Sequence, residues 1–320
     1  MNTAFDLLVS GRPSVDVMFS GLREWPALGK DIDADGLGLC AGTSFNTPAA
    51  ANRIGLRVAY VATIGDDPWS RMIRDEFEAE GLSTEFVEVE HRPLPGVSVA
   101  LNLHGDRGFV THWEDGDMYD ERLHERALGV VARVDARHLH AYVDEAPDLE
   151  ALARARGMTV SLDAWGEDHH GPPHPLTDLL ANADVLFANE AEAAAMSGED
   201  SLERALERLA AHCGCVVIKR GAAGAVALAA GVTRAVAADP AELVDTTGAG
   251  DCFNAGFLTG WLGGLPLGDS LALGVVCGSR AVGDYGGYRG CPREPELRAI
   301  AAERGIMLPP RGAVPEGDPT

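Results

Sequence analysis

The sequence predicts a doubly wound α/β fold, in which a mostly parallel central sheet is flanked by helices. Three observations support this prediction. Short apolar runs typical of buried strands alternate along the chain with stretches of helical composition. Glycine and proline residues separate these segments. In addition, 46% of the 320 residues are hydrophobic, which is enough for a sizeable core and argues against a largely disordered chain.

The first segments follow this alternation. Residues 5–10 form a compact apolar run, which we interpret as a buried strand, and residues 11–13 (Gly-Arg-Pro) suggest a loop at the start of the first crossover. An alanine-rich helix is expected over 46–54 and a strand over 57–64. The next helix should span 68–80, because the proline that begins it suits a first helical turn.

Two short segments interrupt the alternation. Residues 96–103 and 108–113 have strand-like composition and are joined by a short polar connection, which predicts a hairpin. Together with residues 31–39 they are expected to form a small sheet that covers a site as a lid. The lid segments are therefore placed at about 12–40 and 96–115.

The alternation resumes in the second half of the chain. Strands are expected at 136–143, 158–163, 184–188 and 215–219, a hairpin at 225–229 and 232–236, and helices near 201–211, 250–263, 268–283 and 294–304. We assign residues 1–308 to one α/β domain. The proline- and glycine-rich residues 309–320 are expected to be a disordered tail.

The charge balance excludes some partners. The chain has 49 acidic and 26 basic residues, a net charge of −23, which would repel nucleic acid and anionic membrane surfaces. Neither is expected as a partner. The six cysteines are scattered, and the N-terminus has no basic start followed by an apolar run. A cytoplasmic location is the default expectation.

The segment Asp245-Thr246-Thr247-Gly248-Ala249-Gly250-Asp251 carries the chemistry. A strand-like end passes through small residues into an apolar helix that should start near Asp251. The free amides of a first helical turn bind anions, so a phosphoryl group could lie there. A carboxylate beside bound phosphate is unfavourable for simple binding, but phosphoryl transfer needs a base at that place. The alternative is that Asp251 is only an acid at a helix N-terminus.

This segment, continued by Phe253, Ala255 and Gly256, resembles the C-terminal signature of the PfkB or ribokinase family of carbohydrate and nucleoside kinases. Further motifs follow in the family's order from about residue 5 to 303. The resemblance implies that Asp251 is the catalytic base and that the backbone of Gly248, Ala249 and Gly250 is the anion hole.

Other site residues are implied by the same resemblance. Asp245 and Thr247 match positions that in some members help hold a monovalent cation such as K⁺, and Thr247 is also assigned to the ATP side. Asn189 and Glu192 resemble an Asn-x-x-Glu motif that organises water-held Mg²⁺ near the phosphates of ATP. On its own this pattern is a common helix start.

The next motif is a strand followed by Gly221-x-x-Gly224, which resembles the family element beside the nucleotide. Lys219 at the end of that strand is expected to pair with ATP phosphates, although a solvated strand-end cation is the alternative. We expect ATP to lie along this part of the chain.

The acceptor side is predicted near the N-terminus. Asp16 follows the first strand, and Gly42 and Asn46 lie in a segment similar to the family's Gly-Gly-x-x-x-Asn substrate signature. By resemblance, Asp16 and Asn46 hydrogen-bond substrate hydroxyls. Without the family context they would be a turn residue and a helix N-cap. Ala41 replaces the first glycine, which puts the loop geometry in doubt.

The sequence therefore predicts ATP- and Mg²⁺-dependent phosphorylation of a hydroxyl of a small neutral sugar, because no cluster of Arg or Lys stands near Asp16 or Gly42. A nucleoside kinase of the same fold is the nearest alternative. A non-catalytic relative is a second, suggested by Ala41, by Ser70 in place of a usual glycine, and by the absence of an adenine-side Asn. Homodimerisation through exposed lid edges remains open.

Overall fold

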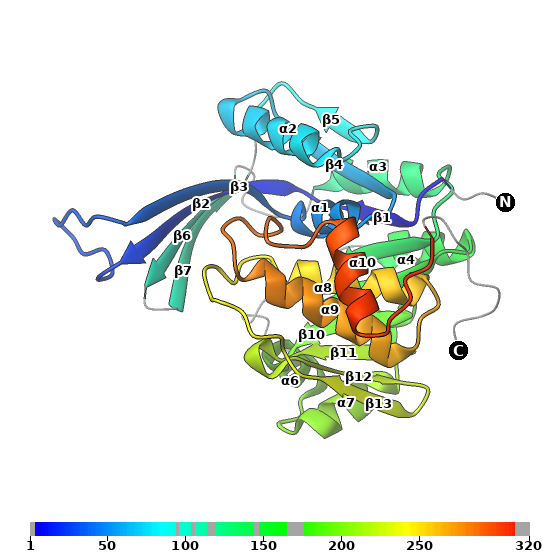
Figure 1. The fold of residues 1–320 in the computed structure, drawn as a ribbon. Coiled ribbons are helices and arrows are strands. Elements are labelled where there is room, and N and C mark those ends of the chain that lie inside the picture. Colours follow the sequence, from blue (N-terminus) through cyan, green and yellow to red (C-terminus); the bar gives the residue numbers. More distant parts are fainter. Residues whose placement is uncertain are drawn as a thin grey trace.

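The computed structural model describes residues 4–93, 96–103, 106–113, 120–143, 147–164 and 176–310. Within these residues the strands form two sheets, a large central sheet inside the body of the molecule and a small sheet that projects from one side (Figure 1). The predicted doubly wound, mostly parallel architecture with a separate small sheet is confirmed. Of the predicted hairpin connection at 104–107, residues 106 and 107 already belong to the second strand of the hairpin. Residues 104–105 and most of the predicted tail, 311–320, lie outside the described residues.

The large sheet has the strand order β13-β12-β11-β10-β9-β8-β1-β4-β5. Its strands are β1 (Leu7–Ser10), β4 (Val58–Ile64), β5 (Val87–Val89), β8 (His138–Tyr142), β9 (Thr159–Asp163), β10 (Val185–Asn189), β11 (Cys215–Lys219), β12 (Ala225–Ala229) and β13 (Val232–Val236). All neighbours pair in parallel except β11–β12 and β12–β13. Parallel strands end at one edge of the sheet, so their terminal side chains gather there.

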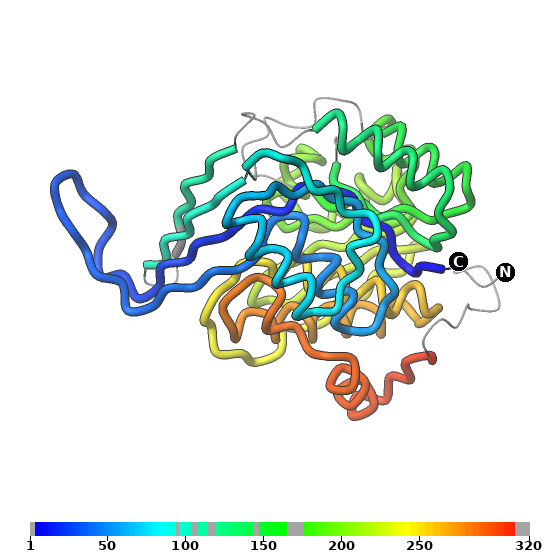
Figure 2. The backbone as a smooth tube through the Cα atoms, turned by 90° about the horizontal axis from the view of Figure 1, so that it is seen from above, coloured from blue at the N-terminus to red at the C-terminus, as the bar shows by residue number. Residues whose placement is uncertain are grey.

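The small sheet has the order β3-β2-β6-β7, with β2 at Pro13–Leu22, β3 at Gly36–Thr43, β6 at Gly96–Leu103 and β7 at Asp106–Trp113. The connection between β2 and β3 reaches farthest from the central sheet (Figure 2). Gly11 and Arg12 lie in the predicted loop, outside any helix or strand, but the loop ends earlier than expected because Pro13 already begins a ten-residue strand. Proline is tolerated as the first residue of a strand, so it marks the beginning of β2 here.

Helices cover both faces of the large sheet. One face packs against α1 (Asn46–Arg53), α2 (Pro68–Glu80), α8 (Ala249–Leu262), α9 (Leu267–Ala281) and α10 (Glu294–Glu303). The other packs against α3 (Glu121–Val131), α4 (Pro147–Ala155), α5 (Leu176–Leu179), α6 (Glu190–Ser197) and α7 (Leu202–Ala210). Successive residues of a strand point to opposite faces, so Leu7 and Val9 belong to the first core and Leu8 to the second.

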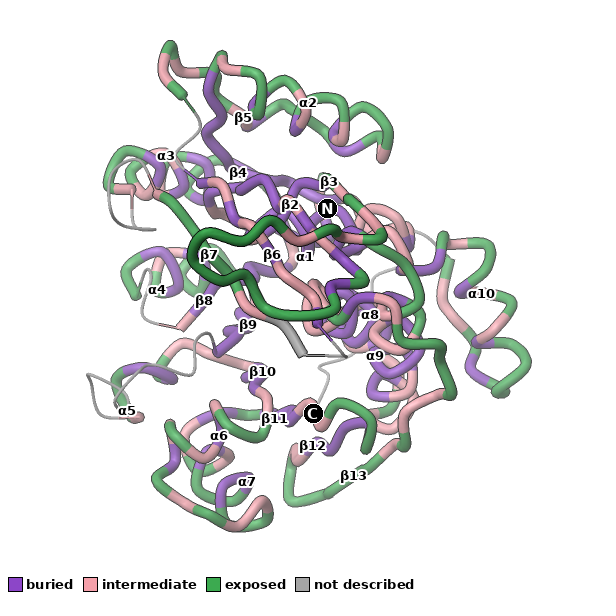
Figure 3. Tube along the Cα trace, turned by 90° about the vertical axis from the view of Figure 1, so that its left-hand side faces the viewer, coloured by how far each residue is buried: buried purple, intermediate pink, exposed green. Residues whose placement is uncertain are grey.

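Burial follows these layers. The strands of the large sheet and much of α8 and α9 are buried, whereas the connection between β2 and β3 is exposed (Figure 3). Helix α8 is apolar nearly all round because it lies between the sheet and α9, and Phe257, Leu258 and Ala255 are fully buried. Within the described residues, no helix is both long enough and apolar enough to cross a membrane.

Candidate active site

A cavity of about 380 Å³ lies where the carboxyl ends of the parallel strands meet the base of the lid. Strands β8 and β9 supply its floor, lid strands β2, β3, β6 and β7 supply one wall, and the segment before α8 supplies another. The side chains and backbone that line it are Asp16, Thr43, Asn46, Ser98, Phe109, Thr111, Trp113, Tyr142, Asp163, Ala164, Thr247, Gly248 and Asp251. The structure therefore brings the predicted base and two predicted substrate ligands to one cavity.

The N-terminus of α8 opens toward this cavity. Its N-cap is Gly248, with φ of 67°, a left-handed conformation that glycine adopts without strain. A Cβ at this position would also lie 2.6 Å from the Cα of Gly287, so the turn packs directly against a second backbone. The amides of Gly250 and Asp251 belong to the first helical turn and have no intrahelical acceptor. Free amides at the positive end of a helix are the groups that bind anions in proteins.

Asp251 lies in the first turn of α8, and its carboxylate is fixed from α1. The Thr47 hydroxyl donates a hydrogen bond of 2.6 Å to Asp251 Oδ1. Burial raises the pKa of Asp251 to about 6, and the negative charge of Asp163 also raises it. Three groups lower this pKa: the Thr47 hydrogen bond, the positive charge of Lys219 and a hydrogen bond from Asn46. Asp251 is therefore ionised near neutral pH with a proton affinity suited to general-base chemistry.

Lys219 ends strand β11 but does not extend into solvent. Its Nζ donates to Asp163 Oδ1 at 2.8 Å and to Asn254 Oδ1 at 3.4 Å. Asn254 Nδ2 in turn donates to Asp163 Oδ2 at 2.7 Å. Burial lowers the pKa of Lys219, but the charge and hydrogen bond of Asp163, together with the charges of Glu192 and Asp251, hold this pKa above its ordinary value, so the ammonium is charged.

The predicted acceptor residues come from β2, β3 and α1. Asp16 is buried and its Oδ1 accepts a hydrogen bond of 3.2 Å from the Ser14 hydroxyl. Burial raises the pKa of Asp16 to about 6, the Ser14 hydrogen bond opposes this, and the Asp245 charge adds to it. Gly42 pairs with Ser14 in the β2–β3 register and lies diagonally from Asp16, and a Cβ there would lie 2.0 Å from Asp16 Oδ2. Asn46, the first residue of α1, has a buried Oδ1 for which no hydrogen-bond partner exists in the described part of the chain.

Asp245 and Thr247 form a local turn before α8. The Asp245 Oδ1 atom accepts from the Thr247 amide at 3.0 Å and from its hydroxyl at 2.8 Å. The other carboxylate oxygen, Oδ2, is buried and has no hydrogen-bond partner among the described residues. A buried carboxylate oxygen without a donor is costly, so this position suits a cation or a water molecule.

The predicted nucleotide-side residues lie next to one another at the same sheet edge. Asn189 and Lys219 are register partners at the ends of β10 and β11. Asn189 and Glu192 form a capping box, in which Asn189 Oδ1 accepts from the Glu192 amide at 2.8 Å and Glu192 Oε2 accepts from the Asn189 amide at 2.7 Å. Gly221 and Gly224 lie in the single 3₁₀ turn after β11.

Several residues of the cavity were not predicted as site residues. Thr47 and Asn254 contact the charged groups of the site, and Phe109 and Trp113 line it from lid strand β7. Asp163 is the last residue of a predicted strand, at the edge of the sheet where ligands were expected, and this position could have identified it as a site residue. The lid residues had no such signal, because their side chains reach the cavity only through the packing of the small sheet.

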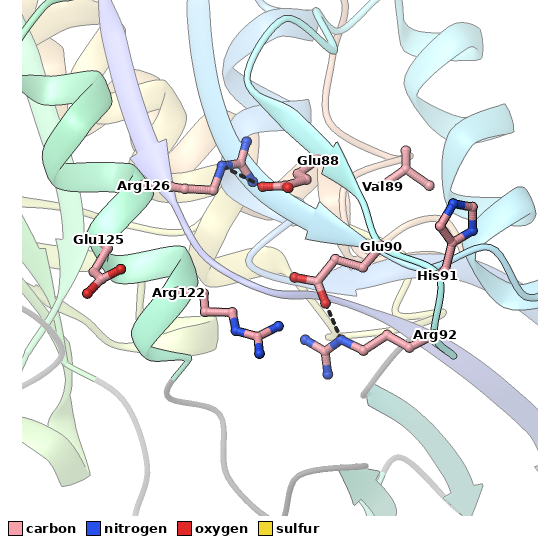
Figure 4. A pocket seen from close by; sticks show the side chains of 8 residues that line it. All are labelled: Glu88, Val89, Glu90, His91, Arg92, Arg122, Glu125 and Arg126. Atoms are coloured by element: carbon pink, nitrogen blue, oxygen red, sulfur yellow. Dashed lines mark hydrogen bonds and ion pairs between the residues drawn. The ribbon is translucent and has the colours of Figure 1, made fainter.

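A second, larger hollow of about 790 Å³ lies between the end of β5 and α3 (Figure 4). Two of its arginines are paired with glutamates: Arg126 Nε lies 3.0 Å from Glu88 Oε2, and Arg92 is paired with Glu90. Arg126 also donates to the backbone oxygens of Ala62 and Phe86. The contacts of Arg126 hold the edge of the sheet to α3. The smaller cavity, with its base and helix N-terminus, is the better candidate for chemistry despite its size.

Comparison with known proteins agrees with this geometry. The family described as pfkB family carbohydrate kinase matches residues 40–294. A fructokinase of Klebsiella pneumoniae is 30% identical over 277 residues, which cover 80% of this chain and 90% of that protein. Among solved structures, Arabidopsis thaliana ribokinase complexed with ribose and ATP has a TM-score of 0.74 at 22% identity, with 93% of this chain and 99% of that chain covered. Adenosine kinase of Sinorhizobium meliloti has a TM-score of 0.71 at 22% identity, with coverages of 94% and 100%.

The fold and the matched relatives define a carbohydrate kinase, a phosphotransferase that uses an alcohol group as acceptor. The chain belongs to the pfkB family of carbohydrate kinases. The match covers α8 and its preceding turn, and thus the segment from Asp245 to Asp251. The predicted family is confirmed.

Proposed function

We propose that the protein transfers the γ-phosphoryl group of ATP to a hydroxyl of a small neutral sugar. The observation that carries this proposal is the position of Asp251. Its half-buried carboxylate lines the cavity and belongs to the same first helical turn as the amides at the N-terminus of α8. An acceptor hydroxyl beside Asp251 and a phosphoryl group on those amides would therefore be neighbours.

In the proposed reaction, Asp251 accepts the proton of the acceptor hydroxyl. The hydroxyl oxygen forms a bond to the γ-phosphorus, the bond between that phosphorus and the β,γ-bridging oxygen breaks, and ADP leaves. The backbone amides of Gly248, Ala249 and Gly250 donate hydrogen bonds to the transferring group and so stabilise its negative charge. Asp251 is suited to this task because its pKa, about 6, leaves it ionised near neutral pH.

We assign ATP to the carboxyl edge of β10 and β11, where Asn189 ends β10 and the turn from Gly221 to Gly224 follows β11, and to Thr247 in the turn before α8. Mg²⁺ bound there would offset the phosphate charge. Glu192 suits it through water, since Mg²⁺ keeps several waters and needs few protein ligands. Asp245, with its buried unpaired Oδ2, suits a monovalent cation such as K⁺.

The acceptor is assigned to Asp16 and Asn46. Both line the cavity, and a substrate hydroxyl would satisfy the buried Asn46 oxygen that otherwise has no donor in the described structure. The titratable side chains among the described lining residues are three aspartates and one tyrosine, with no lysine or arginine. A phosphorylated or carboxylated acceptor would be repelled there, so a neutral one is favoured.

A nucleoside kinase is the second candidate, because Phe109, Trp113 and Tyr142 line the cavity. Aromatic side chains stack on bases as well as on the apolar faces of sugars. A panel of neutral sugars, sugar phosphates and nucleosides, with ADP production as the readout, separates these acceptors. Preference for a nucleoside would replace the sugar proposal, and preference for a sugar phosphate would contradict the neutral acceptor. A protein that consumed no ATP with any of them would be a binding relative.

The base assignment is tested with Asp251→Asn, which keeps the shape of the side chain and removes its basicity. We expect kcat to fall by at least about a hundredfold, the lower range for loss of general-base catalysis, with the ATP dissociation constant nearly unchanged. Asp284→Asn is the matched control, because Asp284 is an exposed acid on the chain that follows α9. Full phosphorylation by Asp251→Asn would overturn the assignment.

A further inference from the structure

Lys219, Asp163 and Asn254 form a closed cluster beneath the first turn of α8. The ammonium contacts both other side chains, at 2.8 Å and 3.4 Å, and those two contact each other at 2.7 Å. The three residues come from β11, β9 and α8, so the cluster joins two strands to the helix that carries Asp251. Asn254 follows Asp251 by three residues and therefore lies on the same side of α8.

The cluster lies directly beside the anion hole. A Cβ placed on Gly250 would lie 3.3 Å from Lys219 Nζ, so the ammonium touches the helical turn from the interior. The lysine and aspartate side chains are only 15% and 10% exposed. An ammonium held by Asp163 and Asn254 in this way has two of its three protons committed to the protein.

An ion pair buried to this degree needs a physical reason. Removing two charges from water costs several kcal/mol per ion, and a well-packed apolar pair is often as stable. The pair is thus weak evidence for stability and better evidence for a role of the charge itself. Asp251 is half-buried, and its carboxylate accepts hydrogen bonds from the neutral side chains of Thr47 and Asn46, so it is the neighbouring group that such a charge would act on.

We propose that Lys219 is a positioning residue of the general base: its buried ammonium is the counter-charge of the Asp251 carboxylate and not a ligand of an ATP phosphate. Asp163 and Asn254 hold the ammonium in place. The inference rests on the proposed function, because it assumes that Asp251 is the base.

The groups that face Asp251 determine the direction in which each substitution should shift the pKa of its carboxyl group. Thr47 and Asn46 of α1 donate hydrogen bonds that favour the carboxylate, Lys219 favours it by charge, and Asp163 of β9 opposes it by charge. Two more groups act on the cluster. Glu192 of α6 adds a negative charge near Lys219. Burial keeps His140 of β8 neutral, with its pKa lowered to about 4.

Opposite charges near Asp251 should shift the activity profile in opposite directions. Lys219→Met removes the favourable charge, so we expect the acid limb of kcat/KM against pH to move up by about one to two pH units. Asp163→Asn removes the unfavourable charge, and the limb should move down. The KM for ATP should change by less than about threefold in both. Arg220→Met is the matched control, because it removes a neighbouring charge that is paired outward with Glu190, and it should leave the limb in place.

The double variant Asp163→Asn/Lys219→Met covers the case in which Lys219→Met alone does not fold, since it removes both charges and leaves neither unpaired. The acid limb of its profile of kcat/KM against pH should lie at higher pH than that of Asp163→Asn. Folding of every variant is checked by circular dichroism and thermal unfolding.

Two results would overturn the inference. One is a tenfold or larger rise in the KM for ATP with an unmoved acid limb, which would make Lys219 a phosphate ligand. The other is a limb that does not move, or moves in the same direction for both single variants, which would make the cluster structural. Either result, with Asp251→Asn inactive, leaves the proposed base intact. An active Asp251→Asn protein would overturn the proposed function itself.

Discussion

The hydrogen bond between Thr47 and Asp251 offers a direct test of how the protein sets the charge of its proposed base. Thr47 is fully buried in α1, and its hydroxyl donates to Asp251 Oδ1 at 2.6 Å. Thr47→Val replaces the hydroxyl with a methyl group of nearly the same shape. The substitution therefore removes a donor to the ionised carboxylate with little change in packing.

The magnitude follows from the energy of that bond. A hydrogen bond to a charged group contributes about 1.5 to 3 kcal/mol, and one pKa unit corresponds to about 1.4 kcal/mol. The pKa of Asp251, about 6 in the native protein, should rise by about one to two units. At about pH 7 the ionised fraction would then fall from about nine-tenths to between about one half and one tenth. We expect kcat/KM to fall about twofold to tenfold at that pH and to recover at about pH 9.5.

The assay is kcat/KM for the best acceptor from about pH 5 to pH 10, measured with saturating ATP. Thr47→Ser keeps the hydroxyl and is the matched control, so its acid limb should stay close to that of the native protein. A Thr47→Val protein that loses activity equally at all pH values would refute the reasoning, because a charge effect must vanish where the base is ionised. An acid limb that did not move would refute it as well.

Two further predictions concern the same cavity. Gly42→Ala should raise the KM for the acceptor by at least about tenfold in two-substrate kinetics, because the added Cβ would overlap Asp16. The matched control is Gly129→Ala, at a helical glycine with open space around it, which should have little effect in the same assay. Asp251→Asn should stabilise the protein. Since burial raises the native pKa of Asp251 to about 6 from 3.8, the native state binds more protons than the unfolded state between these values, and stability falls as pH rises through them. In urea unfolding, the free energy of unfolding of Asp251→Asn should exceed that of the native protein by about 3 kcal/mol at about pH 8, and this difference should disappear below about pH 4. An equal difference at both pH values would show that the gain does not come from the raised pKa of Asp251.

Local sequence signals were sufficient for most of the secondary structure. Pro68 begins α2, where the Asp67 side chain accepts hydrogen bonds from two first-turn amides, and Gly81 ends the helix in a left-handed conformation. Ala230 and Gly231, both with positive φ, connect β12 and β13 as the predicted hairpin requires. Such signals act within a few residues, so they can be recognised without knowing the rest of the fold.

Strand β2 shows where such signals fail. Gly11 and Pro13 indicated a loop, but Pro13 is the first residue of a strand held by β3 on one side and β6 on the other. Those two partners lie far along the chain, and their pairing outweighs the local tendency of proline to end a strand. The same pairing brings Phe109 and Trp113 over the cavity.

The sequence by itself determined the class of reaction, because the residues from Asp245 to Asp251 are contiguous and their chemistry follows from a single turn and helix N-terminus. Only the tertiary structure decided what surrounds the base. Thr47 lies 204 positions from Asp251, and Lys219 lies 56 positions from Asp163. Contacts at such separations depend on which strands become neighbours and how α1 and α8 pack on them, and no local pattern records that choice. Lys219, expected to face ATP, is thereby held in the interior beside the base.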